Sequence, residues 1–264
     1  MTLCVRDLTL AFDSRPVLRG LSANFAPGTF TVVLGPNGVG KTTLLRAMIG
    51  ARPPTSGTVE LDGKPLAAYS GSQRAARLAY VPQRTTIEFG FTTAEVVALG
   101  RYARGPRNHD PVMSALAAVG LESHGARPFR ELSIGQQQRA TLARALAQID
   151  LPGGDPRGKV LLADEPVSSL DPAQALGVLT LLRSLADGGL CVVAVVHDLA
   201  LALRYADGAL VLDSEGGCGA CAPIAEIISS RVLDRVYGVP LDAPGPEDLV
   251  LIPRRAPRAS GPGG

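Results

Sequence analysis

Tryptophan is absent from this chain of 264 residues, and aromatic residues of all kinds make up only 4% of it. Such a shortage argues against a surface on which nucleic-acid bases stack. The net charge is only +2 at neutral pH, so no general affinity for polyanions is expected. The composition, 46% hydrophobic, suits an α/β protein, and the length suits one sizeable domain with at most a smaller lobe attached.

Long apolar runs are also lacking. LCVVAVV at 190–196 is far shorter than the roughly twenty residues that span a bilayer. The N-terminal MTLCVRDLTLAF has neither the basic start nor the cleavage site of a secretory signal. We therefore expect a soluble protein that can dock on a membrane partner.

Cysteine is scarce, with four residues. Cys4 and Cys191 lie in apolar, strand-like runs and are expected to pack as small hydrophobic residues. Cys218 and Cys221 form a C-x-x-C within GGCGACAP, without a second Cys or His pair nearby to complete a zinc site. We predict a tight surface turn here, with a metal or redox site as the alternative, in a reducing compartment.

Strand and helix patterns alternate along most of the chain. Short strands are expected within 2–34, at 78–82, and after 160, where VLLAD, LCVVAVV and ALVLD alternate with helical segments. Residues 92–148 instead hold three helical patterns in succession. The expected fold is α/β, with a mostly parallel sheet and an inserted α-helical subdomain at about 92–148.

Lysine is rare, yet Lys41, one of only three, lies in the glycine-rich GPNGVGKT at 35–42. A buried strand precedes this segment and a helical pattern follows it, which is the context of a phosphate-binding loop. The loop amides and the helix N-terminus would surround the phosphates, Lys41 would reach the β and γ oxygens, and the Thr42 hydroxyl would bind magnesium. The predicted nucleotide-binding residues of this loop are Gly35, Pro36, Asn37, Gly38, Val39, Gly40, Lys41, Thr42 and Thr43.

Two acids and a histidine follow later strands. VLLADEP at 160–166 places Asp164 at a buried strand end, where a carboxylate can hold magnesium, and Glu165 next to it, where a carboxylate can polarise a hydrolytic water. His197 ends the strand LCVVAVV, and because parallel strands end at one sheet edge, a contact to the γ-phosphate is expected. The alternatives are a solvated acidic turn and a structural histidine.

Six motifs in order, GPNGVGKT, VPQ, LSIGQ, VLLADEP, SSLD and the histidine of HDLA, resemble the ATP-binding subunits of ABC transporters. The resemblance spans about residues 2–215. It implies a P-loop NTPase core (ABC ATPase) with a small antiparallel β-subdomain and the helical subdomain, assigned to 1–252. It also implies ATP hydrolysis coupled to transport, with ATP and Mg²⁺ as cofactors.

Residues 253–264, with the sequence PRRAPRASGPGG, are expected to be a disordered basic tail.

The same resemblance implies further site residues. Gln83 would sense magnesium, Asp171 would report across a dimer, and Phe12 would stack on adenine, unless Phe12 is a core residue. Ser133, Gly135 and Gln136 match a signature that usually reads Leu-Ser-Gly-Gly-Gln. Ile134 replaces its first glycine, so this position is expected to need no special backbone conformation.

The signature helix predicts a dimer. Its N-terminus suits a γ-phosphate but lies on the inserted lobe, away from the chain's own loop at 35–42. We therefore expect two copies to bind two ATP molecules between them.

Membrane import is the expected role. FTTAEVVALGRYARGPRN resembles the corresponding stretch in importers of iron-siderophores, haem and cobalamin, and IDLPGGDPRGK with EPVSSLD looks most like the haem branch. The implied partners are permease subunits and, indirectly, a periplasmic binding protein, at the cytoplasmic face of the inner membrane. Import of ferric siderophore or cobalamin is the alternative. A soluble ATPase acting on DNA or ribosomes is an alternative of another class, but no basic stripe with aromatics points to nucleic acid.

Overall fold

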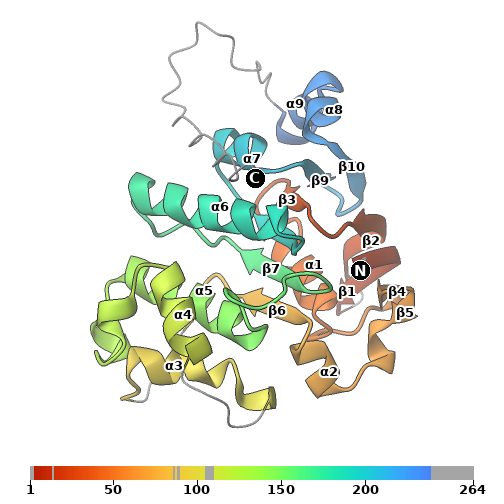
Figure 1. The fold of residues 1–264 in the computed structure, drawn as a ribbon. Helices are drawn as coiled ribbons and strands as arrows, with labels where there is room; N and C mark the ends of the chain where they lie inside the picture. The colour runs from red at the N-terminus through yellow and green to blue at the C-terminus, as the bar shows by residue number, and fades with distance from the viewer. Residues whose placement is uncertain (1–2, 14, 86, 88–89, 105–109, 239–264) are drawn as a thin grey trace, which may run out of the picture.

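A six-stranded sheet forms the centre of the computed structural model, which describes residues 3–13, 15–85, 87, 90–104 and 110–238 (Figure 1). Its strand order is β10-β9-β3-β8-β7-β6, and all pairs are parallel except β10 with β9. The strands are β3 (Phe30–Leu34), β6 (Leu78–Val81), β7 (Val160–Asp164), β8 (Cys191–Val195), β9 (Gly208–Leu212) and β10 (Cys218–Pro223). The predicted, mostly parallel sheet is confirmed.

The middle strands are apolar runs because both faces of the sheet are covered. Every residue of β7 and β8 is buried. β3, β7 and β8 run in the same direction, and β8 lies between the other two. Val195 of β8 pairs with Val33 of β3 on one side and with Asp164 of β7 on the other. The segments that follow these three strands therefore leave the sheet at one edge.

A second, antiparallel sheet of four strands, in the order β2-β1-β4-β5, covers one face together with the first helix. The elements are β1 (Leu3–Phe12), β2 (Arg15–Phe25), α1 (Lys41–Met48), β4 (Ser56–Leu61) and β5 (Lys64–Pro65). Their apolar residues pack with Val33, Val193 and Leu210 of the large sheet. The predicted helix after the glycine-rich loop is confirmed.

Helices cover the other face, where their apolar sides join a larger core. They are α6 (Pro172–Asp187), α7 (Leu199–Tyr205), α8 (Ile224–Ser229) and α9 (Val232–Tyr237). Asp171 caps α6 by accepting the Gln174 amide hydrogen at 2.9 Å, and Pro172 follows at the first helical position. α8 and α9 lie beside β9 and β10 at the end of the described chain (Figure 1).

Helices also dominate the segment between β6 and β7, which forms the yellow and green lobe of Figure 1. α5 (Ile134–Gln148) packs against α3 (Thr93–Leu99) and α4 (Asp110–Ala118). Small residues on α5, among them Ala140, Ala143 and Ala147, are buried and allow this close packing. The remaining short helices are α2 (Gly71–Ala75) and the 3-10 turns Leu66–Ala68, Tyr102–Arg104, Glu122–His124 and Phe129–Glu131.

The predicted turn at the cysteine pair is wrong. Cys218 and Cys221 belong to β10, and the turn comes earlier, where Gly216 has a φ of +79°. Cys218 pairs with Leu212 and Cys221 with Leu210, because a bulge between Cys218 and Ala220 absorbs one residue, so both thiols share one face of the sheet. Both are free and exposed.

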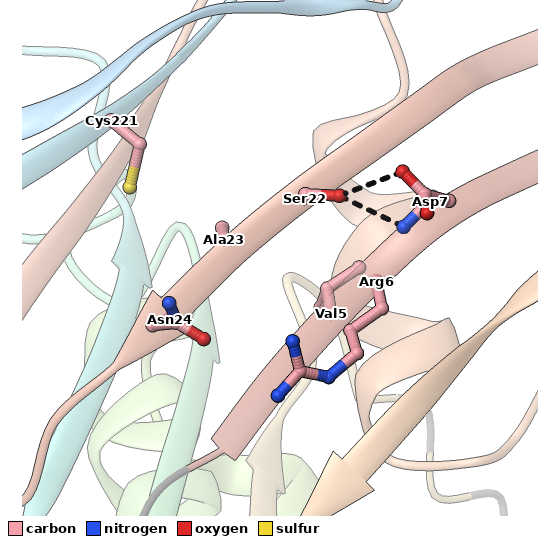
Figure 2. A pocket seen from close by; sticks show the side chains of 7 residues that line it. All are labelled: Val5, Arg6, Asp7, Ser22, Ala23, Asn24 and Cys221. Carbon is pink, nitrogen blue, oxygen red and sulfur yellow. Dashed lines mark hydrogen bonds between the residues drawn. The ribbon is translucent and has the colours of Figure 1, made fainter.

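Cys221 faces a hollow between β10 and the strands β1 and β2, lined by both polar and apolar side chains (Figure 2). In this hollow the Ser22 hydroxyl donates to Asp7 at 3.1 Å and accepts the Asp7 amide hydrogen at 2.9 Å. Within the described residues, no three His, Cys, Asp or Glu side chains are grouped to hold a metal ion.

Two further expectations concern the ends and the membrane. The predicted disordered tail at 253–264 lies outside the described residues. Of the described helices, none combines the length and the apolar character that crossing a bilayer requires.

Candidate functional site

The glycine-rich loop leaves β3 and enters α1 through backbone shapes that other residues rarely adopt. Gly35, Gly38 and Gly40 have φ angles of +142°, +79° and +109°. A Cβ on Gly35 would lie 2.7 Å from the Leu212 carbonyl oxygen, and one on Gly40 would lie 2.8 Å from a Val17 methyl group. Glycine is therefore required at the start and at the end of the loop.

Lys41 is buried at the first turn of α1 and turns back on its own loop. Its ammonium donates to the carbonyl oxygens of Gly35 at 2.7 Å and Pro36 at 2.8 Å. Burial lowers the pKa of Lys41, while the nearby charges of Glu165 and Asp164 raise it. A buried ammonium whose partners are neutral carbonyls is well placed to gain from an anion in the loop.

Asp164, the last residue of β7, is buried beside this loop. The Tyr80 hydroxyl donates to its Oδ2 at 3.2 Å, whereas Oδ1 is buried without a hydrogen-bond partner. Burial raises the pKa of Asp164, and the nearby hydroxyls of Thr42 and Tyr80 oppose that shift. The unpaired Oδ1 and the Thr42 hydroxyl are hard oxygen donors, so this pair fits Mg²⁺.

Glu165 lies at the centre of the site. Its Oε1 lies 2.6 Å from Nε2 of His197, and its Oε2 accepts from Nε2 of Gln83 at 2.8 Å. Three predicted residues, from the ends of three strands, thus meet at one carboxylate. Asn37, Lys41 and Thr42 line the same open hollow as Gln83, Glu165 and His197.

The Glu165 backbone is strained. Its φ is +51°, a region that a residue with a side chain occupies at a cost of about 1–3 kcal/mol. Gln138, from α5, donates to the Glu165 carbonyl oxygen at 2.6 Å and helps to hold this turn. Gln138 therefore connects the helical lobe directly to Glu165, next to the phosphate loop.

Phe12, at the end of β1, is 40% exposed, so the alternative of a core phenylalanine is wrong. The Arg52 guanidinium lies 3.6 Å from the centre of its ring. This ring is accessible for stacking by a planar, electron-poor group.

The signature residues stand at the start of α5. Ser133 caps this helix by accepting the Gln136 amide hydrogen at 3.2 Å, and the Gln136 side chain accepts from the Ser133 amide at 2.9 Å. Ile134 begins the helix with ordinary helical backbone, as expected, and is 72% exposed. Packing within the chain therefore does not explain Ile134.

A Cβ on Gly135 would lie 3.1 Å from Leu170 and 3.3 Å from the Ser169 carbonyl oxygen, so α5 approaches the 168–171 segment closely. The described lining of the phosphate-loop hollow includes neither Ser133 nor Gly135 nor Gln136. The structure thus brings together the loop, Gln83, Asp164, Glu165 and His197, and leaves the signature apart from them.

Tyr80, Gln138 and Tyr237 were missed by the sequence analysis. Tyr80 and Gln138 touch Asp164 and Glu165, and the Tyr237 hydroxyl accepts from the Gly35 amide at 3.1 Å. Tyr80 lies on the strand predicted at 78–82, three residues before Gln83, which is a usable signal. All three contacts join segments that are 27 to 202 residues apart in the chain, so spacing alone does not reveal them.

Comparisons with known proteins point to one family. A family model described as "ABC transporter" matches residues 18–168. A protein of Jannaschia sp. (strain CCS1) named "Hemin import ATP-binding protein HmuV" is 41% identical over 98% of this chain and 97% of its own length. A protein of the same name from Rhodococcus jostii (strain RHA1) is 38% identical over 98% of this chain and 88% of its own.

Solved structures show the same fold. The ATP binding subunit of an ABC transporter superposes with a TM-score of 0.77 at 24% identity, over 90% of this chain and 98% of that one. A dimeric ATP-binding cassette in a post-hydrolysis state, bound to ADP and Pi, has a TM-score of 0.74 at 26% identity, over 84% of this chain and 98% of that one.

Proposed function

The chain belongs to the ABC transporter family of ATP-hydrolysing proteins, and from this premise we propose that it energises a membrane importer of haem. The observation that supports ATP hydrolysis most directly is the convergence of Lys41, Asp164, Glu165 and His197 at one end of the large sheet. The observation that supports haem is the name shared by relatives that are 37–41% identical over most of the chain.

Residues 35–43 and the N-terminus of α1 bind the triphosphate in this proposal. The loop amides and Lys41 neutralise the phosphate oxygens. Phe12 stacks on the adenine ring, either after the Arg52 guanidinium leaves the Phe12 ring or with adenine and Arg52 on opposite faces of it. The contacting residues are Phe12, Gly35, Pro36, Asn37, Gly38, Val39, Gly40, Lys41, Thr42, Thr43 and Gln83, joined by Ser133, Gly135, Gln136 and Asp171 at the interface with a second copy.

Thr42, Asp164 and Gln83 would hold Mg²⁺, which supplies charge neutralisation at the β and γ phosphates when it is bound. Glu165 acts as general base: its carboxylate takes a proton from the water that attacks the γ-phosphorus. His197, 2.6 Å from that carboxylate, orients it and contacts the γ-phosphate, while Lys41 stabilises the charge that develops on the phosphate oxygens. Gln83 connects Glu165 with the segment that leads into the helical lobe.

Two copies would complete two sites. Ser133 and the α5 N-terminus lie on the lobe, so they serve the loop of the partner copy, where the amides and the hydroxyl meet the γ-phosphate. Asp171, at the start of α6, lies at the 168–171 segment that α5 approaches, and would report on the partner's state. Closing of the dimer on ATP moves the helical lobes, and the permease follows them. We assign the ATP-binding domain to 1–252 and place the assembly at the cytoplasmic face of the inner membrane.

The test is ATP hydrolysis by the chain reconstituted with its permease in proteoliposomes. Addition of the binding protein loaded with haem is expected to stimulate phosphate release, and the same protein without haem is the control. Stimulation by ferric siderophore or cobalamin instead, each with its binding protein, would contradict the haem assignment. Purification with ribosomes or DNA and never with a permease would contradict the transport role.

A further inference from the structure

Tyr237 joins the last described helix to the first residue of the phosphate loop. Its phenolic oxygen accepts a hydrogen bond from the Gly35 amide at 3.1 Å and donates to the Gly35 carbonyl oxygen at 3.5 Å. The two residues are 202 positions apart, and they meet because α9 packs beside β9 and β10 (Figure 1). Both polar groups of the Gly35 backbone therefore contact one hydroxyl.

Gly35 has little freedom to move away from this hydroxyl. Its φ is +142°, and the space where a Cβ would point is filled by the Leu212 carbonyl, at 2.7 Å, and by a Val39 methyl group, at 3.2 Å. β3 ends one residue earlier, at Leu34, so Gly35 has left the sheet ladder. An amide at such a place needs a partner from elsewhere, because an unpaired buried amide costs about 1–3 kcal/mol.

The Gly35 carbonyl oxygen has a second donor, the Lys41 ammonium at 2.7 Å. Lys41 also donates to Pro36, so two of its three protons point at loop carbonyls. A nucleotide phosphate in the loop is a stronger partner for an ammonium than a neutral carbonyl is. When Lys41 turns to that phosphate, the donor that remains at the Gly35 carbonyl is the Tyr237 hydroxyl.

We propose that Tyr237 is a positioning residue of the phosphate loop: its hydroxyl holds both polar groups of Gly35, so the loop keeps its shape when Lys41 turns to a nucleotide phosphate. The inference rests on the ATP-binding function proposed above. It gives α9, which carries none of the six motifs, a part in nucleotide binding.

The ionisation of the phenol is consistent with this part. Burial raises the pKa of Tyr237, and the Gly35 amide opposes the shift. The hydroxyl therefore keeps its proton at neutral pH and is available as a donor to the Gly35 carbonyl.

Tyr237→Phe in the full chain tests the proposal, because it removes the hydroxyl and keeps the ring. The variant loses both contacts with Gly35, and a net effect on nucleotide binding of about the size of one hydrogen bond predicts a roughly threefold to tenfold higher Kd for MgATP. Amide hydrogen exchange in the nucleotide-free protein is expected to be faster at Gly35. In the assembled transporter, KM for ATP is expected to rise while kcat stays near that of the wild type.

Tyr69→Phe is the matched control. The Tyr69 hydroxyl also donates to a backbone carbonyl, that of Leu61 at 2.7 Å, but it does so beside the small antiparallel sheet. Both variants are expected to lose some thermal stability, and only Tyr237→Phe is expected to lose affinity for MgATP. An unchanged Kd in Tyr237→Phe, or an equal rise of Kd in both variants, would overturn the proposal.

Lys41→Ala separates this failure from a failure of the proposed function. If Lys41→Ala loses MgATP while Tyr237→Phe binds it like the wild type, only the role of Tyr237 is refuted. If the wild-type chain does not bind MgATP, the ATP-binding function itself is refuted. If Lys41→Ala binds MgATP as well as the wild type, the phosphate-loop role of Lys41 is refuted, and with it the step in which Lys41 leaves the Gly35 carbonyl.

Discussion

Replacement of Glu165 by glutamine is expected to separate ATP binding from ATP hydrolysis. The Glu165 side chain is 15% exposed and contacts Nε2 of both His197, at 2.6 Å, and Gln83, at 2.8 Å. A glutamine has the same shape: its oxygen can accept from Gln83, and its amide can donate to a neutral His197 imidazole. Both contacts survive, so Glu165→Gln is expected to change the melting temperature little.

The variant would lack the general base that we propose. A general base typically contributes a rate factor of about 10²–10⁴. The rate of hydrolysis at saturating ATP is therefore expected to fall by about that factor, which corresponds to a rise of about 2.7–5.4 kcal/mol in the activation barrier. The assay is phosphate release by the assembled transporter, with the Kd for MgATP measured in parallel. Removal of a negative charge near the γ-phosphate should leave that Kd unchanged or lower it, and a closed dimer should accumulate in size-exclusion chromatography with ATP.

Glu226→Gln, at an exposed position on α8, is the control for loss of a carboxylate and is expected to hydrolyse ATP like the wild type. A rate in Glu165→Gln of more than a third of the wild-type rate would refute the general-base assignment. So would a loss of ATP binding, because it would mean that the carboxylate supports the loop.

Two further predictions concern the signature and the metal site. Ser133→Arg is expected to abolish hydrolysis by the assembled transporter while each chain still binds MgATP, because Ser133 belongs to the partner's site in the proposed dimer. Ser184→Arg, on an exposed part of α6, is the control, and equal activity of both variants would contradict the dimer. Asp164→Asn is expected to lose magnesium-dependent hydrolysis and yet to melt at a higher temperature in EDTA at neutral pH. Burial raises the pKa of Asp164, so the folded protein favours the protonated form and loses stability as the pH rises through that raised pKa. The increase in melting temperature over the wild type should shrink as the pH is lowered toward the ordinary Asp pKa of about 3.9. An Asp164→Asn variant that melts at a lower temperature than the wild type at neutral pH would contradict this reasoning.

Local patterns predicted most of the elements. The parallel strands are short apolar runs, the helices begin at caps such as Ser133 and Asp171, and the loop glycines have the backbone angles that a phosphate-binding turn needs. These features depend on neighbouring residues, so they can be read along the chain. The cysteine pair shows where this fails: GGCGACAP has the composition of a turn, but the pairing of Cys218 and Cys221 with β9 made it a strand.

The sequence by itself determined the chemical groups of the candidate site: which loop has the residues to bind a phosphate, which carboxylates end buried strands, and which strands run parallel. Those properties follow from residue type and short spacing. Only the tertiary structure decided how the residues meet, because the contacts of Glu165 with Gln83 and His197, of Asp164 with Tyr80, and of Gly35 with Tyr237 join segments far apart in the chain. A contact of that kind depends on the packing of whole helices and strands, so no short stretch of sequence contains it.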